Sequence, residues 1–162
     1  MYKPRKILSN LDAPYIQSIV ALASTQTKLT LVTWCVDYAE AVVLPLFLKY
    51  EPEDERPRLA LKAAREFMAK KIKFPEAKQA ILACHAAARK ASDNPVAQAA
   101  ARAIGQSASS IHVARHCLGL ALYGALALAY ERVGADAEWS VIEAVAAEEC
   151  AKMEEKLRNL IG

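Results

Sequence analysis

The chain has 162 residues, of which 54% are hydrophobic and 24% are charged. This balance excludes a disordered chain, because enough apolar surface is available to build a core. The 21 basic and 18 acidic residues are mixed along the sequence and leave a net charge of +3, so we expect no nucleic acid as partner. The length favours a single α-helical domain over residues 1–162.

Alanine dominates the composition, with 33 residues against 5 glycines and 7 prolines. Because alanine is the strongest helix former and is depleted in strands, the expected fold class is all-α. Helix caps, prolines and apolar periodicity predict a bundle of about six or seven helices. The predicted helices run over about 14–24, 28–50, 57–71, 74–91, 95–132 and 136–160.

Two of the predicted helices contain a residue that disturbs a helix. Pro45 is expected to kink or end the helix that contains it, because proline has no amide hydrogen. The helix over 95–132 can break at Gly105. From residue 103 to residue 130 this helix carries a single charge, Arg115, so we expect it to be the buried central helix of the bundle.

The apolar runs and the cysteines bear on the location of the protein. The longest uncharged apolar run, 117–130, is shorter than the roughly 20 residues that span a membrane, so we expect no membrane partner. No signal-peptide core follows the basic N-terminus. Cys35, Cys84, Cys117 and Cys150 form no CxxC pair, which is typical of reduced core thiols. We therefore expect a cytoplasmic protein.

A polar seam follows one face of the predicted central helix. Its residues recur at alternating steps of four and three, as in the seam of a coiled coil: Gln98, Arg102, Gly105, Ser109, His112, His116, Gly119 and Tyr123. Elsewhere, His85 and Arg89 share a helix face at i, i+4, and Asp37 and Glu40 lie in an otherwise apolar helix at i, i+3.

Buried charges need partners, because an unpaired charge in an apolar interior is costly. We therefore predict a buried polar network in which Asp37 and Glu40 accept hydrogen bonds from some of the basic groups. The full set expected in the network is Asp37, Glu40, His85, Arg89, Arg102, His112, His116 and Tyr123.

Four interpretations of this network remain open. The first is a structural device that fixes how the helices pack. The second is a metal site, in which His85, His112, His116 and either Asp37 or Glu40 would be the ligands. The third is acid–base catalysis, for which no nucleophile motif is present. The fourth is a polar pocket for a small ligand.

Several blocks of the sequence also resemble a known family. The blocks are Trp34–Glu40 followed by Leu44–Pro45, Asp54–Arg58, His85–Arg89, Ala101–Gln106 and His112–His116, ending at Tyr123. In this order they resemble a family of all-helical bacterial proteins described as "putative immunity proteins", which genome context associates with polymorphic toxin systems. The resemblance covers about 31–130.

The resemblance implies a binding protein rather than an enzyme. The expected partner is a cognate protein toxin of unknown type, the expected cofactor is none, and no catalytic residue is assigned. The polar network would then be a scaffold, and the contact surface would lie elsewhere. Because inhibitors of nucleases tend to present acidic surfaces, the net positive charge favours a target that is not a nuclease.

A second resemblance belongs to a different class of protein. Metal-binding bundles of the DinB-like type also have one histidine on an earlier helix and an HxxxH pair on a later one. This pattern would place zinc or nickel on His85, His112 and His116, in a thiol-dependent transferase or a hydrolase. The resemblance consists of that spacing alone.

Overall fold

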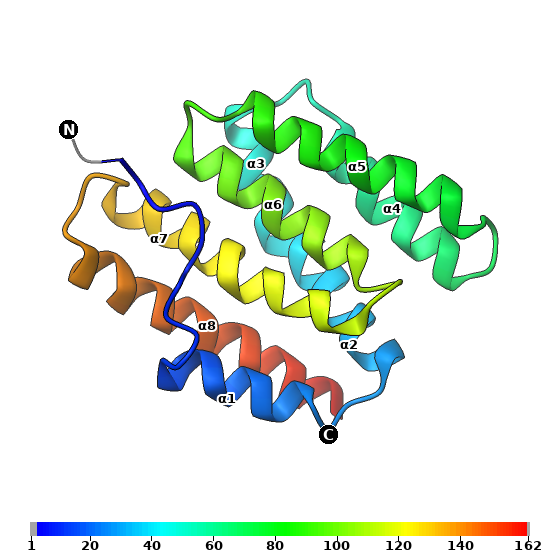
Figure 1. Ribbon diagram of the computed structural model, residues 1–162, viewed down its shortest axis with the longest axis horizontal. Helices are drawn as coiled ribbons and strands as arrows, with labels where there is room; N and C mark the ends of the chain where they lie inside the picture. The colour runs from blue at the N-terminus through cyan, green and yellow to red at the C-terminus, as the bar shows by residue number, and fades with distance from the viewer. Residues whose placement is uncertain (1–2, 162) are drawn as a thin grey trace.

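The structure, a computed structural model, describes residues 3–161 and is an all-α bundle (Figure 1). This confirms the expected fold class. Within the described residues seven continuous helical segments occur and no strand. They are α1 (Pro14–Ala23), α2–η1–α3 (Lys28–Tyr38, Ala39–Val43 and Leu44–Tyr50), α4 (Arg56–Met68), α5 (Phe74–Lys90), α6 (Pro95–Ser109), η2–η3–α7 (Ala114–Leu118, Leu120–Ala125 and Leu126–Val133) and α8 (Trp139–Ile161).

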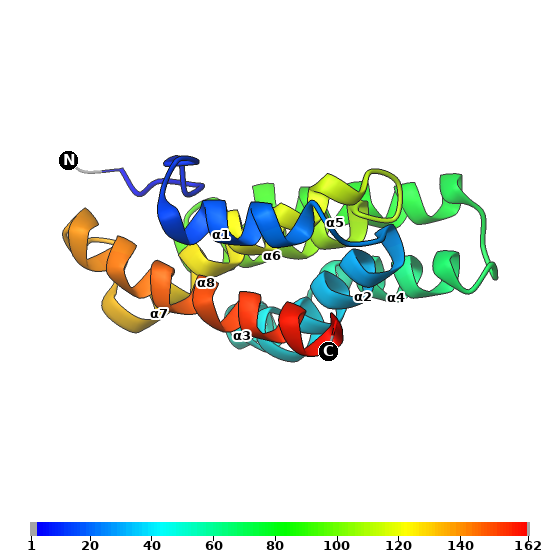
Figure 2. The ribbon, with the colours of Figure 1, turned by 90° about the horizontal axis from the view of Figure 1, so that it is seen from below.

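Helix α6 lies at the centre of the bundle, as expected for the first part of the predicted central helix. It runs between α5 on one side and η3–α7 on the other (Figure 1). The view in Figure 2 shows α3 and α4 as a second layer beneath α5 and α6, and both of these helices contact α6. Helices α8 and α1 pack together at the far edge of the bundle. The outer face of α6 is only partly covered, and Arg102, Gln106 and Ser109 are half-buried there.

The composition of α6 explains its central position. Of its 15 residues 11 are buried, and most of these are alanine or another small residue. Small side chains let neighbouring helices approach closely from several directions. The Asn94 side chain accepts a hydrogen bond from the Ala97 amide at 3.0 Å and so caps the N-terminus of the helix.

The single helix predicted over 95–132 is wrong. Helix α6 ends at Ser109, the chain reverses over residues 110–113, and η2–η3–α7 runs back alongside α6 (Figure 1). The break does not fall at Gly105. At the end of the helix Ser109 Oγ donates to the Gly105 carbonyl at 2.8 Å and Ser110 Oγ to the Ser107 carbonyl at 2.6 Å. Such local bonds compete with continuation of the helix.

Pro45 does not end the helix that contains it. The chain stays helical from Lys28 to Tyr50, and a turn of π-helix, η1, directly precedes the proline. The Leu44 amide donates to the Ala39 carbonyl five residues back. Wide turns of this kind absorb a missing amide donor without ending the helix.

The segment Lys28–Tyr50 is long and apolar enough to cross a membrane by length and composition alone. In the bundle, 61% of its most apolar window is buried against other helices. Its composition is therefore that of a core helix.

The core contains all four cysteines as free, buried thiols, which confirms the expectation of core thiols. Trp34 on α2 is one of the largest fully buried side chains, with 1% of its surface exposed. Its indole nitrogen donates to the Met153 carbonyl at 2.8 Å. This bond ties α2 to α8 across 119 residues of sequence.

We expect Trp34→Ala to lower the free energy of unfolding by about 3 to 5 kcal/mol, because it leaves a cavity and an unmade hydrogen bond between α2 and α8. Denaturant unfolding measures the loss. Leu29→Ala is the matched control on the same helix, since 63% of Leu29 is exposed and its loss should stay within about 0.5 kcal/mol. Equal losses in the two variants would contradict the packing described.

Candidate functional site

The two carboxylates of the α2–η1 segment lie on the surface. The side chains of Asp37 and Glu40 are 52% and 50% exposed. Both bind Arg65 of α4, through ion pairs of 2.9 Å to Asp37 and 3.1 Å to Glu40. The expectation that they accept bonds from the histidines and from Arg89 or Arg102 is therefore wrong. In a helix that is buried on most sides, these residues occupy the stripe that faces solvent.

His85 and Arg102 do meet, across the contact between α5 and α6. A guanidinium nitrogen of Arg102 lies 2.8 Å from Nδ1 of His85. Because arginine has only donors, Nδ1 accepts this bond and the imidazole proton lies on Nε2. Burial, and then the positive charges of Arg102 and Arg89, lower the pKa of His85 to about 4. The ring is thus neutral at pH 7.

Gly105 makes this contact possible. A Cβ atom at position 105 would lie 2.7 Å from Cε1 and 2.8 Å from Nε2 of His85. Since real Cβ contacts are never this short, any other residue would displace the ring. The glycine of the predicted seam therefore provides the space in which the imidazole packs against α6.

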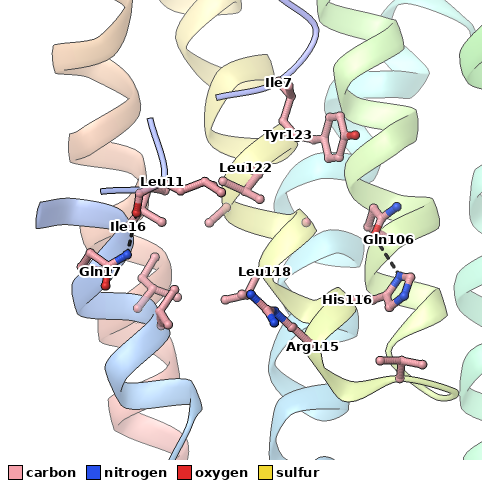
Figure 3. Close-up of a pocket in the computed structure, with 15 residues that line it drawn as sticks. Ile7, Leu11, Ile16, Gln17, Gln106, Arg115, His116, Leu118, Leu122 and Tyr123 are labelled. Carbon is pink, nitrogen blue, oxygen red and sulfur yellow. Dashed lines mark hydrogen bonds between the residues drawn. The ribbon is translucent and has the colours of Figure 1, made fainter. Parts of the chain in front are cut away.

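A second polar contact joins α6 to η2. His116 Nδ1 lies 3.0 Å from Oε1 of Gln106, and Figure 3 shows the two side chains pointing toward each other. Gly119 permits the approach, because a Cβ there would lie 2.2 Å from Cβ of Gln106. Sequence reasoning missed Gln106 as a member of the site, although it follows Arg102 by one helical turn.

The remaining residues of the predicted network are dispersed. His112 is exposed in the chain reversal, and its ring stacks on Phe74 at a centroid distance of 4.4 Å. Arg89 is exposed on α5, one turn from His85. Tyr123 is half-buried on η3, and Figure 3 shows its ring directed toward α6. No single buried network forms from these groups.

The residues considered as metal ligands do not assemble. Throughout residues 3–161 no three His, Cys, Asp or Glu side chains lie close enough to hold a metal ion. His112 and His116 do not share a helix, since α6 has ended before the first and η2 begins after it. The geometry needed for the DinB-like alternative with zinc or nickel is therefore not present in the described chain.

A pocket of about 410 Å³ opens beside the Gln106–His116 pair. α1, the N-terminal segment and η2–η3 form its mostly apolar walls, with Ile16, Leu122 and Tyr123 among the lining residues (Figure 3). A second pocket of about 490 Å³ shares Val20, Arg115 and Leu118 with the first. The two pockets therefore adjoin along α1. Figure 3 shows Arg115 on the α1 side of η2 and His116 on the α6 side.

The thiols do not offer nucleophilic chemistry. Burial raises the pKa of Cys35, Cys84 and Cys150 to about 12 and that of Cys117 to about 11. A thiol with so high a pKa is protonated at pH 7 and unreactive. The described side chains around the Gln106–His116 pair present hydrogen-bond donors beside apolar pockets.

Residues 21–156 match the family described as "Imm-5 like putative immunity protein". The chain belongs to this family. The match includes the whole of 31–130, the range over which the sequence blocks resemble immunity proteins. No curated protein and no solved structure significantly matches the chain. Membership of an immunity-protein family implies a partner toxin in general terms.

We expect the His85 imidazole of this family member to titrate near pH 4, which NMR of the ring protons measures directly. In Gly105→Ala the displaced ring should gain water, and its pKa should rise toward the ordinary value of 6.5. Gly124→Ala is the control, because a Cβ there meets its nearest neighbour at an ordinary 3.4 Å. The same low pKa in all three proteins would show that Gly105 does not position the ring.

The same pKa predicts how stability depends on pH. Between pH 6.5 and pH 4 the imidazole of His85 is protonated in the unfolded chain but neutral in the folded chain. The unfolding free energy should therefore fall as the pH is lowered through this window and should not fall further from this cause below pH 4. His85→Gln should remove this part of the slope, measured by denaturant unfolding at several pH values.

Replacing Asp37 by alanine should cost about 1 kcal/mol or less, since an exposed ion pair contributes little to stability. Glu40→Ala, which removes the other carboxylate on Arg65, should behave alike. A loss above about 2 kcal/mol in thermal or denaturant unfolding would point to a buried role for Asp37 after all.

Proposed function

We propose that this chain is an immunity protein that neutralises a cognate protein toxin by forming a complex with it. The observation that carries the proposal is the family match over residues 21–156. Immunity proteins protect the cell that makes the toxin, so the complex would form in the cytoplasm of a bacterium. Four free cysteines suit such a reducing compartment.

The chemistry of the surface supports binding over catalysis. The polar residues that line the pockets include the imidazole of His116, the guanidinium of Arg115, the amide of Gln106 and the phenol of Tyr123. These groups donate hydrogen bonds and pack against apolar side chains, as residues at protein interfaces do. The pockets themselves are open along α1, and their apolar walls could receive side chains of a partner.

The charge of the chain bears on the kind of toxin. Inhibitors that block nucleases tend to carry acidic surfaces which imitate nucleic acid. This chain has a net charge of +3 and lacks that character. The proposed toxin is therefore not a nuclease.

The test is co-expression with the reading frame adjacent to the gene for this chain. Expressed alone, the product of that frame should arrest growth, and co-expression should restore growth. An inactive variant of the toxin should bind the purified chain with a Kd in the nanomolar range by calorimetry, since effective inhibition requires a long-lived complex. Trp34→Ala, which weakens folding, should protect less well at elevated temperature.

Continued growth arrest together with no measurable binding would overturn the proposal. Growth rescue without binding would also contradict it, because protection would then proceed by a route other than complex formation. An unrelated helical protein expressed at the same level is the control for nonspecific relief of toxicity.

A further inference from the structure

The basic and acidic residues of the chain are unevenly divided among its helices. Residues 77–130, which include most of α5, all of α6 and all of η2–η3, hold five Lys or Arg residues and all three histidines but one acid, Asp93. The other 17 acidic residues lie outside this segment. Apart from Glu76 in the first turn of α5, the charged side chains that α5, α6 and η2 bring to their common face are therefore all basic, although the chain as a whole is nearly balanced.

Arg102 is the central cation of this face, and the described residues contain no carboxylate that pairs with it. Its one hydrogen bond among residues 3–161 goes to the neutral ring of His85. The nearby carboxylate of Asp54 is already held by Arg56, through bonds of 2.9 and 2.7 Å to its two oxygens. A half-buried guanidinium without an acid is unusual, because desolvation of the charge has no compensating partner.

The hydrogen-bond donors around Arg102 are also unfilled. Since Nδ1 of His85 accepts from Arg102, its Nε2–H remains a donor with no partner within the described chain. The other N–H groups of the Arg102 guanidinium likewise have no hydrogen-bond acceptor among residues 3–161. His116 lies close enough for its charge to affect the pKa of His85. Several donors and no acid are thus gathered in one place.

We define the polar patch as His85, Arg102, Gln106 and His116. All four side chains are half-buried, so a partner can reach the patch, while neighbouring side chains shield part of it from water. Gln106 and His116 also line the apolar pocket of about 410 Å³. A partner that binds the polar patch and also fills the pocket would carry an anionic group next to an apolar side chain.

We propose that the polar patch is the toxin-binding surface of this chain and that it receives a carboxylate of an acidic partner protein, with an adjacent apolar residue seated in the pocket beside His116. This inference rests on the proposed function. It also reverses the expectation that the seam is only a scaffold, because its residues Arg102 and His116 are half-buried and accessible rather than enclosed.

A protein carboxylate fits the patch better than a nucleic-acid backbone. Binding to successive phosphates requires a track of Lys and Arg residues, whereas the patch has one arginine, flanked by the exposed Arg89, and a neutral histidine. A single carboxylate matches one guanidinium in charge and shape. A sugar-phosphate backbone also has no apolar side chain that could fill the pocket.

The first arm of the test compares two arginine variants for binding to the inactive toxin. Arg102→Gln should weaken the complex at least tenfold, since it removes a charge-assisted contact. Arg65→Gln removes the same charge from α4, where Arg65 already pairs with Asp37 and Glu40, and should change the Kd less than twofold. Arg102→Lys, which keeps the charge, should recover part of the loss. Circular dichroism melts establish that each variant is folded.

Equal Kd values for Arg102→Gln and Arg65→Gln would overturn the proposal. If Arg102→Gln does not fold, Arg89→Gln takes its place, because Arg89 is exposed beside the patch and should weaken binding about threefold. No effect of Arg89→Gln would count against the patch.

The second arm needs no toxin and so separates failure of this inference from failure of the proposed function. The probe is the peptide N-acetyl-Leu-Glu-Leu-amide, titrated into the purified chain while NMR follows the imidazoles of His85 and His116. The Glu peptide should shift both signals, and the matched Leu-Gln-Leu peptide should not. Absence of shifts with the Glu peptide overturns the carboxylate site, as does inorganic phosphate that saturates the same signals at a lower concentration.

Discussion

The close approach of neighbouring helices to α6 is the constraint on which this molecule depends. Alanines and one glycine form most of the buried surface of α6, so α3, α4, α5 and the returning η2–η3–α7 segment can all pack against it. Larger side chains at these positions would move the axes apart. The close packing of these helices also places His85 of α5 in contact with Arg102 of α6, and Gln106 of α6 in contact with His116 of η2.

The sequence was sufficient to predict the general architecture. Alanine content, prolines and periodicity predicted an all-α bundle with about the right number of helices and with a central helix. These features depend on local propensity and on one-dimensional spacing, which a single sequence contains. The family resemblance in the ordered blocks was likewise recoverable, because the residues involved are read directly from the chain.

The chain reversal after α6 could not be predicted from the same information. A seam that continues at steps of four and three has the same pattern in one long helix and in two antiparallel helices packed against each other. The reversal carries no glycine or proline. The serine hydroxyls at this point bond to carbonyls of the preceding turn, but Ser107 makes the same kind of bond inside α6, so serines alone did not indicate an end.

The position of the carboxylates was missed for a related reason. Asp37 and Glu40 were placed in the core because their helix is apolar on most sides, yet such a helix can keep one narrow stripe exposed. Their actual partner, Arg65, lies on α4, whereas the expected partners Arg89 and Arg102 lie on α5 and α6. Which helix covers which stripe is decided by packing in three dimensions. Of the predicted network, His85 and Arg102 do meet, because α5 and α6 pack directly against each other.

The four thiols inside the core have a practical consequence for spectroscopy. Because their pKa values lie at about 11 to 12, maleimides and methanethiosulfonates would leave the natural cysteines untouched in the folded protein. A cysteine introduced at an exposed position such as Val113 could then carry a fluorophore or a spin label without first removing any native sulfur. Distances across the bundle would become measurable in otherwise unaltered protein.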